Sequence, residues 1–248
     1  MAIPTLHQFA FSHFNEKARW ALDYKGIAHR RETYLPGPHM APIKRLSGQT
    51  ATPVLQQGDV VTAGSAAIIE VLEHAHPEPA LYPDDAALRQ EALAWQAHYD
   101  ATVGPAVRTV VFSILVNEGG YLCAMFGGSK GVLKRTLYRA SFPLARGLIA
   151  KGNGVVDPNN VERCYETTRQ ALGALADRVG ATGYVVGDAF SIADLTSAAL
   201  FAPIAALEHP DMRRPRPVPA AFAEMVAEFA SHPGIQWVES IYARYRSM

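Results

Sequence analysis

Residues 51–69, with the sequence ATPVLQQGDVVTAGSAAII, decide the fold. Two short apolar runs flank the turn pair Gly58-Asp59, and this arrangement predicts a β-hairpin over residues 52–62. Ser65 then opens a run with helical spacing. The apolar residues of that run share one side: Ile68, Ile69, Leu72 and Ala75. We therefore expect a hairpin that leads directly into a helix.

The segment before this hairpin alternates between strand and helix patterns. Strands are predicted at Thr5–Phe9 and His29–Leu35, and the apolar spacing between them predicts a helix over Phe14–Lys25. Gly26 follows where a helix C-terminus commonly needs a left-handed residue. A loop rich in Pro and Gly comes next, with a short helix expected around Pro42–Leu46. The predicted order is strand, helix, strand, loop, hairpin, helix, which is an α/β arrangement.

A proline-rich stretch, residues 76–83 (HPEPALYP), predicts a linker to an almost wholly helical remainder. Residues 84–116 predict one long helix or two, because Gly104-Pro105 interrupts the pattern. Residues 118–158 contain several Gly-rich breaks, predict no clear element and could cover a cleft. Further helices are predicted at 159–179, 191–207, 219–230 and 235–245. We expect two domains, at residues 1–77 and 84–248.

The composition argues against several classes of partner. Hydrophobic residues make up 49% and charged residues 19%, as in ordinary globular proteins. Lys plus Arg equal Asp plus Glu at 23 each, so a zero net charge gives no general attraction to nucleic acid or anionic membranes. Residues 1–11 do not have the pattern of a secretory signal, and Cys123 and Cys164 form no CxxC pair. We therefore expect a cytoplasmic protein that binds neither nucleic acid nor membrane.

Three short segments could carry chemistry. Ser12 lies between the first strand and the first helix, where it is either an N-cap or a hydroxyl that stabilises a bound thiolate and lowers the thiol pKa. Thr52-Pro53 is either an ordinary trans proline or a cis bond that turns the Thr52 backbone toward an extended peptide. Ser65 can cap its helix, and that helix end also suits a carboxylate.

Other motifs are structural or missing. Ser191-Ile192-Ala193-Asp194 fits a capping box, for which we expect a structural role. The histidines form no metal set, Ser12 has no evident His–Asp partners, and phosphate-binding fingerprints do not occur, so no metal is expected. One set of residues could line an apolar pocket or simply pack helices together: Trp95, His98, Tyr99, Val103 and Phe112.

Four of these motifs together resemble the cytosolic glutathione S-transferase family. They are residues 12–22 with Lys25-Gly26-Ile27, residues 51–55, residues 64–69 and residues 183–195. Their order and spacing match the family over nearly the whole chain, except residues 118–158. The resemblance implies a serine-type, bacterial-like member with the glutathione S-transferase fold, in which a thioredoxin-like α/β domain precedes an all-α domain. It also implies a homodimer.

The resemblance implies roles for individual residues, with glutathione as a co-substrate and detoxification as the general purpose. Ser12 falls where serine-type members hold the glutathione thiolate, and Thr52 with Pro53 falls where the cysteinyl unit is bound. Ser65, preceded by Gly64, falls where the γ-glutamyl carboxylate is held. His39 is placed near the glycyl end. A small apolar electrophile would lie against Phe14, Trp95, His98, Tyr99 and Phe112.

Two departures from the family pattern leave an alternative open. Gly64 stands where an acidic or amide side chain is usual, and Ala51 stands where Lys or Gln is common. Losing a charge-assisted contact costs about 1.5–3 kcal/mol. A non-catalytic ligand-binding or interaction protein with weak or no glutathione binding is therefore the alternative. With the same thiolate, the enzyme could also isomerise, dehalogenate or cleave ethers, whereas disulfide reduction is disfavoured because the turn at Ser12 lacks a cysteine.

Overall fold

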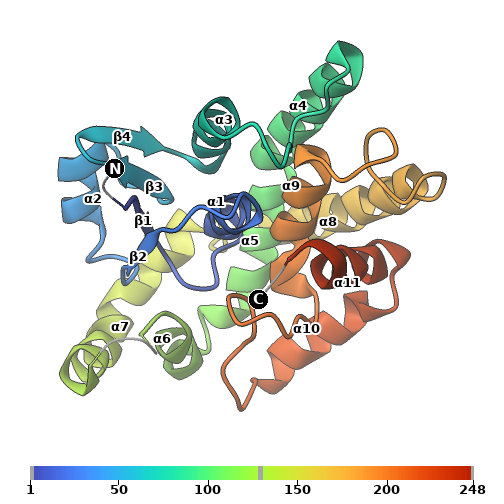
Figure 1. Cartoon of the computed structure of the whole chain (residues 1–248). Helices are drawn as coiled ribbons and strands as arrows, with labels where there is room; N and C mark the ends of the chain where they lie inside the picture. Colours follow the sequence, from blue (N-terminus) through green and yellow to red (C-terminus); the bar gives the residue numbers. More distant parts are fainter. Residues whose placement is uncertain (1–2, 128–130, 247–248) are drawn as a thin grey trace.

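A four-stranded sheet organises the N-terminal half of the computed structural model, which describes residues 3–127 and 131–246 (Figure 1). Its strands are β1 (Thr5–Gln8), β2 (Arg30–Thr33), β3 (Val54–Gln57) and β4 (Val60–Ala63), in the order β2-β1-β3-β4. Strand β1 pairs parallel with β2 and antiparallel with β3, and β3 pairs antiparallel with β4. The predicted hairpin is confirmed, as is the thioredoxin-like arrangement.

Three helices accompany the sheet: α1 (His13–Tyr24), α2 (Met40–Ser47) and α3 (Ser65–Ala75). Helices α1 and α3 lie between the strands and the helical half, and α2 lies on the other side of the strands (Figure 1). The prediction that Ser65 caps α3 is wrong, because Gly64 is the N-cap and Ser65 is the first helical residue. Gly64 has a φ of 94°, which residues with a side chain rarely adopt. The chain therefore enters the helix one residue earlier than expected.

Helix α1 is the element on which the two halves meet. Its polar residues are buried together with its apolar ones, and each of several has a partner in the helical half. The Lys17 ammonium donates to the Asp100 carboxylate at 2.6 Å, and Trp20 Nε1 donates to the Tyr245 carbonyl at 3.0 Å. Buried polar groups need such partners. These contacts therefore fix α1 relative to the helices around it.

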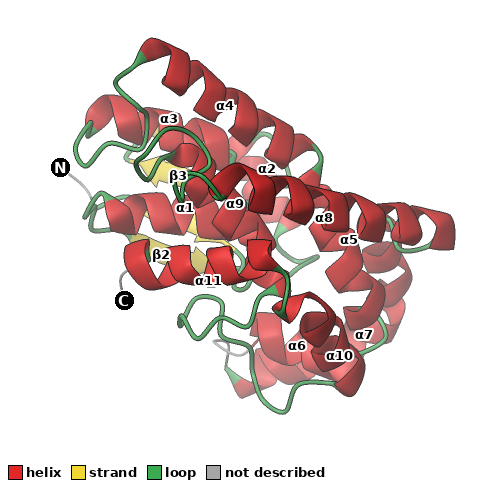
Figure 2. Ribbon diagram, turned by 90° about the vertical axis from the view of Figure 1, so that its right-hand side faces the viewer, coloured by secondary structure: helices red, strands yellow, loops and turns green. Residues whose placement is uncertain are grey.

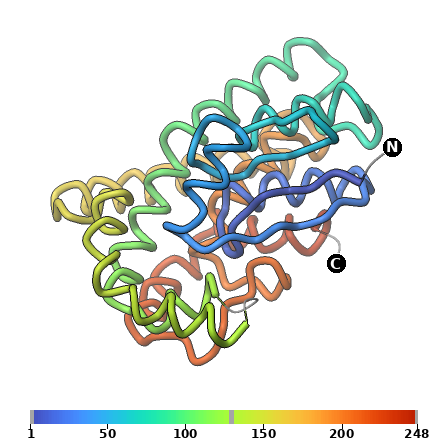
Figure 3. Tube along the Cα trace, turned by 90° about the vertical axis from the view of Figure 1, so that its left-hand side faces the viewer, coloured from blue at the N-terminus to red at the C-terminus, as the bar shows by residue number. Residues whose placement is uncertain are grey.

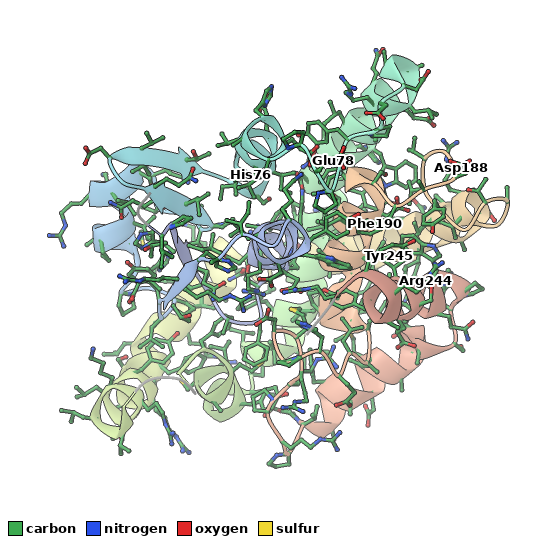
Figure 4. All side chains as sticks on the ribbon, viewed as in Figure 1. His76, Glu78, Asp188, Phe190, Arg244 and Tyr245 are labelled. Carbon is green, nitrogen blue, oxygen red and sulfur yellow. The ribbon has the colours of Figure 1, made fainter. Side chains whose placement is uncertain are left out.

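The proline-rich linker is tied to the N-terminal half. The Lys25 ammonium donates to the carbonyls of His76 and Pro79 at 2.6 and 2.9 Å and pairs with the Glu73 carboxylate at 2.6 Å. Glu73 in turn accepts from the backbone N–H groups of Leu81 and Tyr82. Figure 4 shows His76 and Glu78 of the linker near the end of α3, above α1. The linker is thus held in place by a buried cation and a buried carboxylate.

The helical half contains α4 (Ala86–Ala101), α5 (Val103–Leu115), α6 (Gly119–Gly127), α7 (Val132–Gly152), α8 (Pro158–Val179), α9 (Ile192–Phe201), the 3-10 turn η1 (Ala202–Ile204), α10 (Ala220–Ala230) and α11 (Pro233–Tyr245). The break between α4 and α5 falls at Thr102, and Pro105 lies in the first turn of α5, where a proline is tolerated. Residues 118–158, for which no element was expected, contain α6 and α7. Figure 2 shows the short strands enclosed by helices. None of the described helices is both long and apolar enough to cross a membrane.

Helix α9 is the buried centre of the helical half. The predicted capping box is present at its start, where Asp194 accepts from the Ser191 N–H at 2.9 Å and from the Val185 N–H at 2.8 Å. Phe190, just before this cap, stacks on Tyr245 of α11 with ring centroids 4.2 Å apart (Figure 4). The cap therefore also joins the start of α9 to the C-terminal helix.

Candidate functional site

A cavity of about 500 Å³ lies between the N-terminal half and the helical half. Its N-terminal wall is the turn after β1, the loop before α2 and residues 50–52. Its helical wall comes from α5, α6 and α7. Figure 3 shows the segment of α6 and α7 below the strands and α2, in yellow-green. The region without a predicted element therefore covers one side of this cavity.

Ser12 lies in the cavity wall at the start of α1. It is the N-cap residue by backbone position, with φ −92° and ψ 123°, but its side chain makes no capping hydrogen bond. Instead its Oγ accepts from the Asn15 amide at 2.7 Å. A serine hydroxyl can accept and donate at the same time. The Ser12 proton is thus available for an acceptor in the cavity.

Asn15 joins the two polar groups of this wall, and the sequence reasoning missed it. The side chain is fully buried, and its Nδ2 donates both to Ser12 Oγ and, at 3.2 Å, to Thr52 Oγ1. The amide therefore holds the turn after β1 against the segment before β3. Its position as the third residue of α1 gives no signal in the sequence, because its partners lie in two different segments.

The structure brings Thr52 to the same wall as Ser12. The Thr52–Pro53 peptide bond is cis, Thr52 lines the cavity, and Pro53 is buried. The Gly64 N–H donates to the Pro53 carbonyl at 2.9 Å, which places the start of α3 next to this loop. Ser65 is buried, and neither Ser65 nor Gly64 is among the residues that line the cavity. Ser12 and Thr52 therefore lie in the same wall of the cavity. Ser65 lies outside this wall, at the start of α3 next to Pro53.

His39 is at the N-terminus of α2 and also lines the cavity. Its Nδ1 accepts from the Gly37 N–H at 3.0 Å, and its ring meets Phe9 edge-on at 4.6 Å. Burial lowers the pKa of His39 below its ordinary value. The ring therefore favours its neutral form.

The residues predicted for the electrophile pocket do not all lie at this cavity. Phe14 and Phe112 line the cavity, whereas Trp95, His98 and Tyr99 lie outside it. Trp95 Nε1 donates to Ser197 Oγ of α9 at 2.8 Å, and the Trp95 ring stacks on Tyr99 at 4.7 Å. His98 is exposed. The aromatic stripe of α4 thus packs against α9, and helical spacing alone could not tell which neighbour the stripe faces.

Two ionisable residues of the cavity wall were not predicted. His13 Nε2 is 3.0 Å from the Gly104 carbonyl, and burial, followed by the charge of Arg108, lowers the pKa of His13 to about 3. His13 is therefore neutral at ordinary pH. Arg108, on α5, lines the same cavity as His13. Its place in an otherwise apolar helix was the available signal, but the sequence did not show that this helix lines a cavity.

Three potential metal ligands, Glu16, His209 and Asp211, come within 4.8 Å of one another on the described chain. The Glu16 carboxylate, however, accepts from Arg19 Nε at 2.7 Å and from Arg246 Nε at 2.8 Å. Asp211 accepts from Arg246 and from Arg31, each at 2.7 Å. Guanidinium groups therefore already satisfy these carboxylates, and the group is an ion-pair cluster.

Comparison with known proteins gives one sequence family and one fold. Residues 6–80 match the family described as glutathione S-transferase, N-terminal domain. Glutathione S-transferase 1 of Dianthus caryophyllus is 37% identical over 95 residues, which are 37% of this chain and 42% of that relative. The chain thus matches about two fifths of the length of this curated relative.

Solved structures are similar over almost the whole chain. The beta-etherase LigF of Sphingobium sp. strain SYK-6 has a TM-score of 0.71 and 18% identity, covering 98% of this chain and 96% of its own. A glutathione S-transferase of Methylobacterium radiotolerans, solved with glutathione sulfonate, has a TM-score of 0.58 and 17% identity, covering 95% and 93%. Identities this low show the fold alone. The chain therefore has the glutathione S-transferase fold.

Proposed function

We propose that this protein is a serine-type glutathione transferase whose cavity binds glutathione on its N-terminal wall and a second substrate against α5, α6 and α7. The observation that carries the proposal is the state of the Ser12 hydroxyl. It lines the cavity, leaves its own helix uncapped and accepts from Asn15, so its proton can be donated to a bound sulfur. The match of residues 6–80 to the transferase N-terminal domain supports the same assignment.

Glutathione would extend along the loop before β3. In this proposal the Thr52 backbone pairs with the cysteinyl unit, and the N-terminus of α3 at Gly64 and Ser65 attracts the γ-glutamyl carboxylate, since helix N-termini favour anions. Pro53 fixes the loop between these two contacts. His39 lies on the opposite side of the wall, next to Phe9, where it would contact the glycyl end.

Ser12 would act on the protonation state of the sulfur. A hydroxyl that donates to the thiolate favours the anion, and the N-terminus of α1 acts in the same direction, so the pKa of the bound thiol falls. Each unit of lowering corresponds to about 1.36 kcal/mol. The thiolate then attacks an electrophilic carbon of the second substrate, forming a carbon–sulfur bond while the leaving group departs with its electron pair. Isomerisation, dehalogenation and ether cleavage can start from the same thiolate.

The helical wall would hold the second substrate and exclude water. The helical wall of the cavity is lined by apolar side chains of α5, α6 and α7: Val111, Phe112, Leu122, Phe126 and Ile149. Charge interactions are stronger where water is excluded. A cytoplasmic homodimer with a role in detoxification belongs to the same proposal, and size-exclusion chromatography with light scattering tests the dimer.

A non-catalytic binding protein is the second candidate, because Gly64 provides no side chain for the γ-glutamyl group and its φ of 94° opposes any residue that would. Isothermal calorimetry with glutathione separates the two candidates. Heat of binding at millimolar glutathione or below supports the transferase. No heat and no thermal shift at that concentration would favour the binding protein.

Ser12→Ala tests the mechanism, with Ser47→Ala as its control, because Ser47 is a half-buried serine on α2 whose hydroxyl donates to the Ile43 carbonyl outside the cavity wall. We expect Ser12→Ala to lower kcat/KM for conjugation by about 10- to 100-fold, the size of one charge-assisted hydrogen bond. Thiolate absorbance of bound glutathione at neutral pH should fall as well. Full activity with normal glutathione binding would exclude this role for Ser12.

A further inference from the structure

Arg108 is a cation without a counter-ion in the cavity wall. Its Nε is buried, and no hydrogen bond or ion pair joins its guanidinium to another residue of the described chain. Burial lowers the pKa of Arg108, and no neighbouring carboxylate opposes that effect. An arginine nevertheless stays charged at ordinary pH. The protein thus keeps a half-buried positive charge in the cavity wall that no carboxylate of the described chain neutralises.

The surroundings of this charge are apolar. Arg108 shares one face of α5 with Val111, Phe112 and Leu115, at helical spacings of three, four and seven residues, and all four line the cavity. The other ionisable side chains among the described residues of the lining are His13 and His39, whose pKa values are both lowered by burial. The only full charge that these lining residues present to a ligand at neutral pH is therefore positive.

We propose that Arg108 binds an anionic group of the second substrate, so that the cavity takes an amphipathic organic acid, with an aromatic or alkyl body and a carboxylate or sulfonate, as the electrophile. A ligand anion would give this unpartnered cation charge-assisted hydrogen bonds with its guanidinium fork, and such bonds are stronger where an apolar cavity excludes water. The aromatic and aliphatic wall would bury the body of the same molecule. An uncharged apolar electrophile would leave Arg108 without a partner.

Because this substrate class rests on the proposed function, the test uses binding rather than turnover. The probes are anilinonaphthalene sulfonate, which is anionic, and phenyl-naphthylamine, which has the same aromatic body without the sulfonate. Fluorescence titration gives the Kd of each for the wild type and for Arg108→Met. We expect the Kd of the anionic probe to rise by about 10- to 100-fold and that of the neutral probe to change by less than about 2-fold.

The Tm of Arg108→Met also distinguishes a ligand-binding role of Arg108 from a structural role. Replacing an unpaired, half-buried charge by an apolar side chain should leave the Tm of the free protein unchanged or raise it by up to about 2 °C. Arg163→Met on α8 is the control, since Arg163 is 67% exposed and is not among the lining residues. It should change neither the Tm nor the Kd of either probe. A lower Tm for Arg108→Met, or an equal loss of both probes, would overturn the proposal in favour of a packing role.

The glycyl carboxylate of glutathione is another source of an anion at this cavity. Calorimetric titration of glutathione into Arg108→Met distinguishes the two sources. An unchanged glutathione Kd together with selective loss of the anionic probe supports the second substrate. A 10-fold weaker glutathione Kd without selective loss of that probe would overturn it. Both readouts are independent of conjugating activity, so the proposed transferase could fail while the anion site stands.

Discussion

Glu16→Gln should be among the most destabilising single changes in α1, although it alters shape very little. Glu16 is fully buried, and its two carboxylate oxygens accept from Arg19 Nε and Arg246 Nε at 2.7 and 2.8 Å. Tyr242 donates to it as well, at 3.4 Å. A glutamine keeps one acceptor, but its amide nitrogen meets a guanidinium, donor against donor.

The expected loss follows from the charge count of this cluster. Three carboxylates, of Glu16, Asp23 and Asp211, face three guanidinium groups, of Arg19, Arg31 and Arg246, so the cluster is neutral. Breaking a buried pair costs about 3–5 kcal/mol when the remaining charge has no other partner. Here Asp211 stays within 2.7 Å of Arg246 and 3.7 Å of Arg19. We therefore expect a loss of about 2–4 kcal/mol in the free energy of unfolding.

Urea denaturation followed by circular dichroism measures this loss, and Glu91→Gln is the matched control. Glu91 pairs with Arg178 on the surface, where the side chains of Glu91 and Arg178 are 45% and 42% exposed. An exposed pair contributes about 0–1 kcal/mol. The midpoint should thus fall clearly for Glu16→Gln and hardly for Glu91→Gln. Equal midpoint shifts for the two variants would refute the view that burial gives the cluster its stabilising effect.

Three further predictions concern buried and glycine positions. The folded-state pKa of His13 is about 3, below the ordinary 6.5, so the unfolded chain binds a proton at a higher pH than the folded protein does. The free energy of unfolding therefore decreases as the pH falls from about 6.5 toward 3. Between pH 7.5 and pH 5 the wild type should lose about 2 kcal/mol more than His13→Gln, as measured by urea denaturation. Gly104→Ala would place a Cβ 2.5 Å from Phe14 Cζ and should destabilise the fold by about 1–3 kcal/mol. Gly147→Ala on α7 would place a Cβ with no atom within 4 Å and should stabilise the fold by about 0.5–1 kcal/mol. Thermal unfolding compares the two variants, and similar Tm shifts would contradict the close packing at Gly104. Gly64→Ala meets no atom within 4 Å but must adopt φ 94°, so a loss of about 1–3 kcal/mol, measured by urea denaturation, should come from backbone strain alone, and an unchanged midpoint would exclude it.

Short-range patterns predicted most of the fold. The hairpin, the capping box at Ser191 and the strand–helix order of the first half depend on residues close in sequence, and the structure confirms them. No helix was predicted in residues 118–158, because their glycines were interpreted as breaks. Gly119 is instead the first residue of α6, where a Cβ would be 2.4 Å from Phe142 of α7. Its small size serves the packing of two helices, and that contact is invisible to a local pattern.

The candidate site could be predicted only where its residues are defined locally. The positions of Ser12 and Thr52 follow from a strand-to-helix turn and from a proline at a strand start. Asn15 and Arg108 were missed because their importance depends on what lies opposite them in space. Trp95, which was predicted to line the electrophile pocket, lies outside this cavity and donates to Ser197 of α9. Helical spacing identifies a face, but the fold decides what that face contacts.

Arg108 differs from the buried cations of the described residues in having no protein partner, which favours a ligand over a structural role. Lys17 pairs with Asp100, Lys25 with Glu73, and both Arg19 and Arg246 with Glu16, so these desolvated charges are each balanced by a carboxylate. Arg214, which is half-buried like Arg108, donates instead to the carbonyls of Pro203 and Ala205 at 2.8 and 2.6 Å, so Arg108 is the one among these six cations that has no hydrogen-bond partner in the described chain. Retaining the charge in a cavity wall lowers stability and creates a place for an anion, which is the usual exchange of stability for function at binding sites.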